Sequence, residues 1–134
     1  MKPRGSDALG RAPLFRAALI FLALAGAAFP ALAKQGYLRS PDIHGDRIVF
    51  TAEGDLWTAG TDGSDARRLT SHVGDEGAAA YSPEGKWIAF TGDYDGNSDL
   101  IVMPVGGGEP KRLTWHPGRD ICVGWRPDGS TIIL

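Results

Sequence analysis

A repeat of about 44 residues constrains the fold of this chain more than any other feature of its sequence. Three short motifs recur 44 positions later: Arg68-Leu-Thr as Arg112-Leu-Thr, Asp55-Leu as Asp99-Leu, and Tyr81-Ser-Pro-Glu-Gly as Trp125-Arg-Pro-Asp-Gly. Each copy holds short runs rich in β-branched and aromatic residues, separated by Gly, Pro, Asp and Asn. These runs leave no room for a helix between them, so the repeat predicts strands joined by tight turns.

A period of 40 to 44 residues with four short strands in each copy is typical of a β-propeller blade. The most complete copy predicts four strands, from the innermost to the outermost, at 79–82, 87–91, 100–103 and 111–114. The copy before it predicts strands at 47–51, 56–58 and 67–70, after a lead-in at 36–46 that is rich in Pro, Gly and charge. The two copies differ in length only in one turn, where a surface loop tolerates variation.

A third copy stops at 131–134, in the middle of a blade. The predicted fold is therefore all-β, with about two blades of four antiparallel strands and a stub of a third. The predicted blade units are 41–76, 77–120 and 121–134. Because a blade buries its faces only against its neighbours, we interpret 34–134 as an incomplete N-terminal propeller and the sequence as the beginning of a longer protein.

Residues 1–33 have the pattern of a secretory signal peptide. Four basic residues accompany an apolar run at 17–29, which predicts a helix; Pro30 ends it, and Ala31-Leu-Ala33 supplies the small residues that a signal peptidase requires. We predict cleavage after Ala33 and a periplasmic or secreted location. The alternative is an uncleaved anchor, although the 17 residues of 17–33 fall short of the ~20 that a membrane-spanning helix needs.

The rest of the chain, 34–134, is acidic: it holds 10 of the 14 Lys and Arg residues and 15 of the 16 Asp and Glu residues. An acidic domain without a basic patch is not expected to bind nucleic acid. Cys122 is the only cysteine, so an internal disulfide is impossible. Its apolar neighbours, Ile121 and Val123, favour a buried small side chain over a reactive thiol.

Two groups of side chains could form a metal or catalytic site. His44, His72 and His116 have no Ser or acidic partner at a suggestive spacing, and the repeat favours a structural turn role for the last two. The run from Asp93 to Asp99 carries an oxygen ligand at every second position, as a calcium loop does. Its Gly is fourth rather than sixth and its twelfth residue is Pro, so we interpret the run as a hairpin turn.

The remaining candidates also have simpler structural interpretations. The triple glycine at 106–108 is not followed by Lys-Ser/Thr or a helix, so it predicts a turn rather than a phosphate cradle. Blade packing is the preferred role for the tryptophans, rather than a sugar or base platform: Trp57, Trp87, Trp115 and Trp125. Arg67-Arg68 and Lys111-Arg112 predict a solvated outer edge rather than an anion site. We predict no catalytic, cofactor-binding or metal-binding residue.

The repeat resembles the propeller repeats of TolB-like proteins, through residues 81–90, 99–103 and 111–114. The opening of the region is more specific. Residues 41–50, followed by Glu53-Gly-Asp-Leu-Trp57, resemble the start of the first propeller of tricorn-type proteases. This resemblance covers 36–134, and with the predicted signal peptide it implies an exported bacterial homologue.

The tricorn resemblance implies a serine peptidase in which two propellers gate and guide peptides ahead of a PDZ-like domain and a catalytic core. It also implies assembly into rings and peptide substrates. We predict no cofactor, and membrane contact only through the signal peptide during export. The catalytic residues of that family would lie C-terminal to residue 134, so we expect no hydrolysis by 34–134 alone. The alternatives are a non-enzymatic TolB-like binding propeller, or a propeller fused to an amidohydrolase or prolyl-oligopeptidase-type enzyme.

Overall fold

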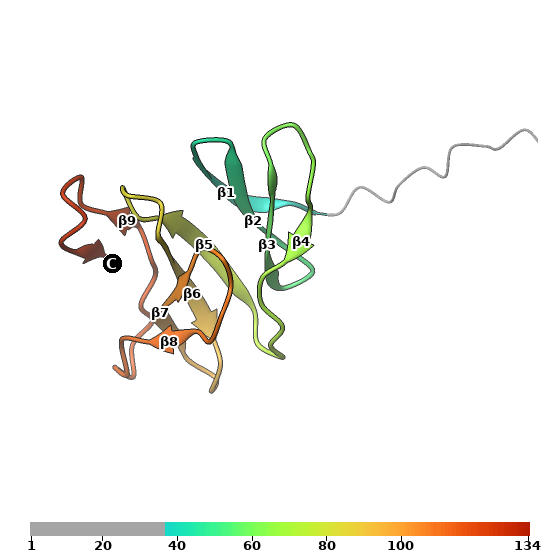
Figure 1. Ribbon diagram of the computed structural model, residues 1–134. Helices are drawn as coiled ribbons and strands as arrows, with labels where there is room; N and C mark the ends of the chain where they lie inside the picture. The colour runs from blue at the N-terminus through green and yellow to red at the C-terminus, as the bar shows by residue number, and fades with distance from the viewer. Residues whose placement is uncertain (1–36) are drawn as a thin grey trace, which may run out of the picture. The chain divides into compact units, whose positions relative to one another are not determined.

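The computed structural model describes residues 37–134, which form two four-stranded sheets and one two-stranded sheet, all antiparallel (Figure 1). The first sheet contains β1 (Arg39–His44), β2 (Arg47–Ala52), β3 (Asp55–Gly60) and β4 (Arg67–Arg68). The second contains β5 (Glu76–Tyr81), β6 (Trp87–Asp93), β7 (Ser98–Pro104) and β8 (Lys111–Arg112). The last pairs β9 (Gly124–Trp125) with β10 (Ile132–Ile133).

Strand order follows chain order in both large sheets, as in a propeller blade. The predicted all-β fold of four-stranded antiparallel blades is therefore confirmed. The signal-peptide helix and the cleavage site predicted in 1–33 lie outside the described residues. Among residues 37–134, no helix is long and apolar enough to cross a membrane.

The interpretation of 36–46 as a lead-in without a strand is wrong, because β1 is the first strand of the first blade. It pairs with β2 from His44, opposite Arg47, back to Arg39, with an irregular register between Arg39 and Asp42. Proline is tolerated in a strand at such a bulge, which explains why Pro41 does not interrupt the sheet. The same irregularity recurs in β5, between Gly77 and Ala80.

The turns are those that the repeat predicts. Between β2 and β3, Glu53 and Gly54 both have positive φ angles of 55° and 89°, as a two-residue type I′ hairpin requires. The Ser-Pro-Glu-Gly turn closes when the Gly85 amide donates to the Ser82 carbonyl over 2.8 Å. The outer strands are shorter than predicted, since β4 and β8 have only two residues each.

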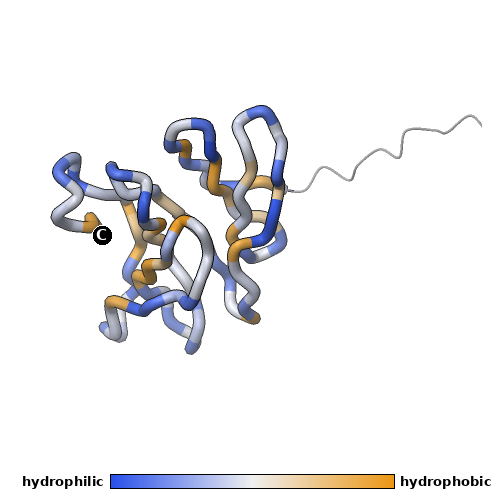
Figure 2. Tube along the Cα trace, in the orientation of Figure 1, coloured by the Kyte–Doolittle hydropathy of each residue, from blue (hydrophilic) through white to orange (hydrophobic). Residues whose placement is uncertain are grey.

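The core lies between the two blades. It combines buried apolar side chains of both large sheets: Val49, Leu56, Ala79, Tyr81, Ile88, Phe90, Ile101 and Met103. Alternate residues of the central strands face the other way, so that Ala89 and Leu100 pack with Cys122 in a second cluster. Burying each large side chain contributes about 1.5–3 kcal/mol. In Figure 2 the hydrophobic segments lie mostly along the central strands, while most turns and the outer strand β4 are hydrophilic.

Polar contacts also join successive blades. The Asp42 carboxylate in β1 accepts a 2.7 Å hydrogen bond from the backbone amide of Tyr81 in β5. The Trp125 indole N–H in β9 donates to the Ala80 carbonyl over 3.1 Å. Packing between blades, predicted for the tryptophans, is therefore right for Trp125. It is wrong for Trp87 and Trp115, which are 42% and 68% exposed; Trp87 begins β6, and Trp115 follows β8.

Candidate functional site

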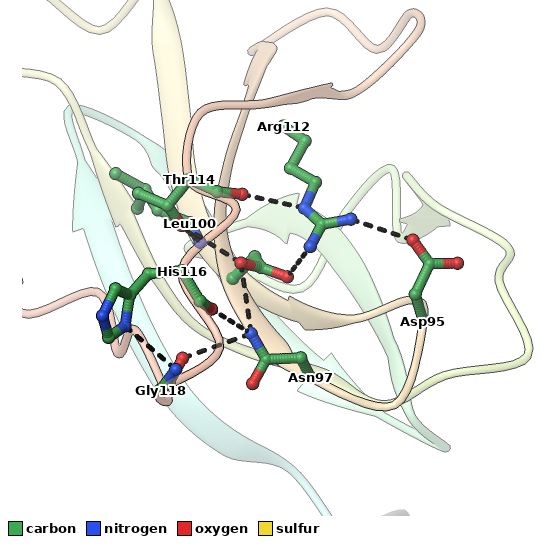
Figure 3. Close-up of polar contacts among 8 residues, drawn as sticks. Asp95, Asn97, Leu100, Arg112, Thr114, His116 and Gly118 are labelled. Atoms are coloured by element: carbon green, nitrogen blue, oxygen red, sulfur yellow. Dashed lines mark hydrogen bonds and ion pairs between the residues drawn. The ribbon is translucent and has the colours of Figure 1, made fainter.

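The motif that defines the repeat forms the same polar cluster in both large blades. In the second blade, Arg112 contacts Asp99 over 2.5 Å and Asp95 over 2.9 Å, and its Nε donates to the Thr114 carbonyl (Figure 3). The Thr114 hydroxyl accepts from the Leu100 amide over 2.9 Å. Arg112 therefore neutralises a buried carboxylate and holds the end of the outer strand.

The first blade repeats the contacts of Asp99, Arg112 and Thr114 with Asp55, Arg68 and Thr70, but without a counterpart of Asp95. Arg67, Arg68 and Lys111 are exposed on the outer strands, as predicted, and Arg112 is half-buried. The prediction did not include the ion pairs of Arg68 and Arg112. Each guanidinium is the counterion of a buried aspartate, which would be very costly without a partner. The sequence contains a signal for these ion pairs, since Asp55 and Arg68 both recur 44 residues later, as Asp99 and Arg112. The prediction considered the aspartates and the arginines separately.

The residues of the suggested calcium loop point to different partners. Asp95 and Asp99 bind Arg112, whereas the Asn97 amide donates to the carbonyl oxygens of His116 and Gly118 over 2.6 and 3.2 Å (Figure 3). Their oxygens therefore do not converge on one point. Within residues 37–134, no group of three or more His, Cys, Asp or Glu side chains could hold a metal ion.

Two of the three candidate histidines close turns, and His44 lies in β1 beside the ring of Tyr81. Nδ1 of His72 accepts from the Gly74 amide over 3.0 Å, and Nδ1 of His116 accepts from the Gly118 amide over 2.9 Å. Cys122 is buried, and burial raises the pKa of its thiol to about 11. A thiol with so high a pKa stays protonated and unreactive near neutral pH.

A buried carboxylate that sequence reasoning missed lies at the junction of the two blades. Glu76, which is 3% exposed, begins β5 and accepts hydrogen bonds at both oxygens. Oε1 binds the Tyr94 hydroxyl over 2.6 Å; Oε2 binds the Leu56 amide over 3.2 Å and also the Thr70 hydroxyl. Glu76 thus connects both blades. Its only sequence signal was the acidic Asp120, which occupies the same repeat position.

Tyr94 completes this junction from the turn after β6. Its ring stacks on His72, with ring centroids 3.8 Å apart. Burial, together with the hydrogen bond to Glu76, raises the pKa of Tyr94 well above its usual value. The phenol therefore stays a neutral donor to the carboxylate.

Next to Glu76 is a hollow that we call the rim pocket, at the beginnings of the first strands of the blades. Its volume is about 280 Å³. It is lined by Arg39, Ser40, Thr51, Asp75, Glu76, Gly77, Ala78, Thr91, Asp93, Ser98, Arg119 and Ile121. The first strand of a propeller blade lies beside the central channel. The rim pocket is therefore the described feature best placed to contact a molecule in that channel.

Charge in the rim pocket is not neutralised internally. Of its five charged residues, Arg39 and Arg119 form no ion pair within the described part of the chain, and the same is true of Asp75 and Asp93. Only Glu76 has its oxygens fully engaged. The pocket thus offers both acidic and basic groups to a ligand.

Comparison with known proteins gives consistent matches. A family model described as the tricorn protease N-terminal beta propeller domain matches residues 35–134. Tricorn protease homolog 1 of Streptomyces coelicolor is 40% identical over 73 residues, which are 54% of this chain and 7% of that protein. The chain therefore spans only a small part of this curated relative.

Two solved structures share the arrangement of strands. A crystal structure of the tricorn protease has a TM-score of 0.62 and 32% sequence identity, over 70% of this chain and 10% of that one. A putative TolB from Agrobacterium tumefaciens has a TM-score of 0.63 over 70% of this chain and 36% of that one. Its 22% identity shows a common fold and nothing more.

Proposed function

Because this chain belongs to the tricorn protease N-terminal β-propeller family, we propose that its blades gate and guide peptides for a tricorn-like serine peptidase. The observation that carries this proposal is the family match over 35–134, which includes every described strand. The TolB likeness does not favour the alternative of a non-enzymatic binding propeller, because it extends to the fold alone.

The chemistry of the first strands supports contact with peptides. Five of the six residues of β1 are exposed, and the rim pocket beside it presents unpaired carboxylates and guanidiniums. Such groups can hydrogen-bond the amides, carbonyls and termini of a peptide. An extended peptide passing the first strands would therefore find polar partners in place of a purely apolar wall.

The described residues would position peptides and would not cleave them. In this proposal, hydrolysis belongs to a catalytic serine in another part of the protein, and the whole protein forms a homo-oligomer. Export to the periplasm or the outside of the cell, after removal of 1–33, belongs to the same proposal. It rests on the apolar run and the Ala-Leu-Ala sequence of that segment.

A blocking experiment tests the guiding role. Ser40 is exposed and lines the rim pocket, so we would attach a bulky maleimide to Ser40→Cys in the intact protein, after replacing other reactive cysteines. The matched control is Ser64→Cys, in an exposed turn between β3 and β4. We expect the label at Ser40→Cys to slow hydrolysis of long peptides severalfold and the control label to have no effect. Equal rates for both labelled proteins would refute the guiding role.

A further inference from the structure

We infer that the rim pocket binds a primary ammonium group, as carried by the free N-terminus of a peptide. The first indication is Thr51, whose side chain lines the pocket. Thr51 is 1% exposed, and its Oγ1 has no hydrogen-bond partner among residues 37–134. Leaving a buried hydroxyl unpaired is unfavourable, so a ligand that supplies the missing partner gains affinity.

The repeat shows what is missing at Thr51. Its counterpart in the second blade is Thr91, whose Oγ1 accepts a 2.8 Å hydrogen bond from the Cys122 amide of the next blade. The residue equivalent to Cys122 is Ala78. Ala78 has a φ of 49° and lies in the irregular part of β5, and its amide does not reach Thr51. The first junction between blades therefore has an open acceptor where the second has a closed one.

A second unpaired atom belongs to another residue that lines the same pocket. Oδ1 of Asp93 is buried and has no hydrogen-bond partner in the described part of the chain. A carboxylate oxygen only accepts hydrogen bonds, so Asp93 requires a donor. The backbone amide of Asp93 is held by the Asp75 carbonyl over 2.9 Å, which fixes this residue at the pocket wall.

The ligand must therefore be a compact group with several N–H donors and a positive charge. An ammonium group has three donors and is attracted by the carboxylates of Asp75, Glu76 and Asp93. Arg39 and Arg119 also line the pocket, and as pure donors they suit the carbonyl oxygens next to a peptide N-terminus. The volume, about 280 Å³, suits the end of a chain rather than a large ligand.

The test compares short peptides of one sequence with a free or an acetylated N-terminus, bound to the intact protein after serine-directed inhibition. We expect the free amine to bind at least about tenfold more tightly, as one charged hydrogen bond to a buried partner allows. Asp93→Asn and Thr51→Val should each remove most of this difference. Glu109→Gln, an exposed acid outside the pocket, should keep it.

Equal binding of the free and acetylated peptides would overturn the inference, as would undiminished discrimination in a folded Asp93→Asn variant. The latter result would mean that water alone satisfies these atoms. An acetylated peptide with an internal Lys separates the two sources of ammonium: weak binding supports the N-terminus, and tight binding assigns the site to a lysine side chain.

The inference rests on the proposed peptide-guiding function, but the two can fail separately. Peptide hydrolysis by the intact protein, with no preference for the free amine in binding, would overturn the ammonium site and leave the guiding function. Amine-dependent binding without any peptide hydrolysis would support the site and overturn the proposed peptidase.

Discussion

Substitution of Tyr94 by Phe should loosen the junction between the first two blades. It removes the 2.6 Å hydrogen bond to Glu76 and keeps the ring that stacks on His72. A hydrogen bond to a charged group contributes about 1.5–3 kcal/mol, and the partial exposure of Tyr94 places the loss near about 1.5 kcal/mol. Glu76→Gln should cost more, about 2–3 kcal/mol, because Leu56 and Thr70 also lose a charged acceptor.

Amide hydrogen exchange at Leu56 provides a local assay, since its N–H donates to both Thr70 and Glu76. Exchange there should accelerate about tenfold in Tyr94→Phe, and Tyr37→Phe, at a highly exposed tyrosine, is the matched control. The double variant Tyr94→Phe/Glu76→Gln should show a coupling energy of about 1 kcal/mol between the two substitutions. Unchanged exchange in Tyr94→Phe, or strict additivity with Glu76→Gln, would show that the Glu76 contacts do not join the blades.

Three further outcomes follow from the same structure. Thr91→Val should destabilise the protein by about 1–3 kcal/mol in urea denaturation, because it leaves the Cys122 amide unpaired. Thr51→Val should be neutral or slightly stabilising, because the Thr51 hydroxyl has no partner to lose among residues 37–134. The reverse order of stabilities would contradict the hydrogen bond assigned between the blades. Cys122 should resist alkylation at pH 8 until the protein unfolds. A rapid alkylation of the folded protein would refute the burial of this thiol. Because the folded pKa of the Cys122 thiol, about 11, is above its unfolded pKa of ~8.5, its contribution to the free energy of unfolding should be complete below pH ~8.5 and lost as the pH rises toward 11. Mass spectrometry of the exported protein should find an N-terminus after Ala33, and an intact leader would favour the anchor.

Sequence reasoning succeeded where a feature recurs. The displacement of Asp55-Leu to Asp99-Leu was enough to predict the blades, because strands and turns depend on local residue types. It failed for β1, because Pro41 and the charged residues of this segment are not typical of a strand. The segment nevertheless pairs with β2, with an irregular register between Arg39 and Asp42. It also missed Glu76, because the partners of that carboxylate come from two blades and no local pattern brings them together.

The rim pocket was beyond prediction for a related reason. The proposed ammonium site depends on the Thr51 hydroxyl, which has no hydrogen-bond partner among residues 37–134. Thr91 is the equivalent residue of the repeat, and its hydroxyl has a partner. The two identical side chains have different surroundings: the Cys122 amide reaches Thr91, whereas the Ala78 amide, in the irregular part of β5, does not reach Thr51. A difference of backbone position between equivalent residues has no signature in composition or periodicity.

The contacts that complete a blade differ in sequence separation from those that join blades. Asp55 finds Arg68 only 13 residues away, whereas Asp42 reaches Tyr81 across 39 residues and Trp125 reaches Ala80 across 45. No blade therefore waits for a distant part of the chain to close its own outer edge. During synthesis, each blade can form as it emerges and then dock on the one before it. This order of assembly limits the exposed apolar surface at any moment to the face of the newest blade, which we expect to lower the risk of aggregation before the chain is finished.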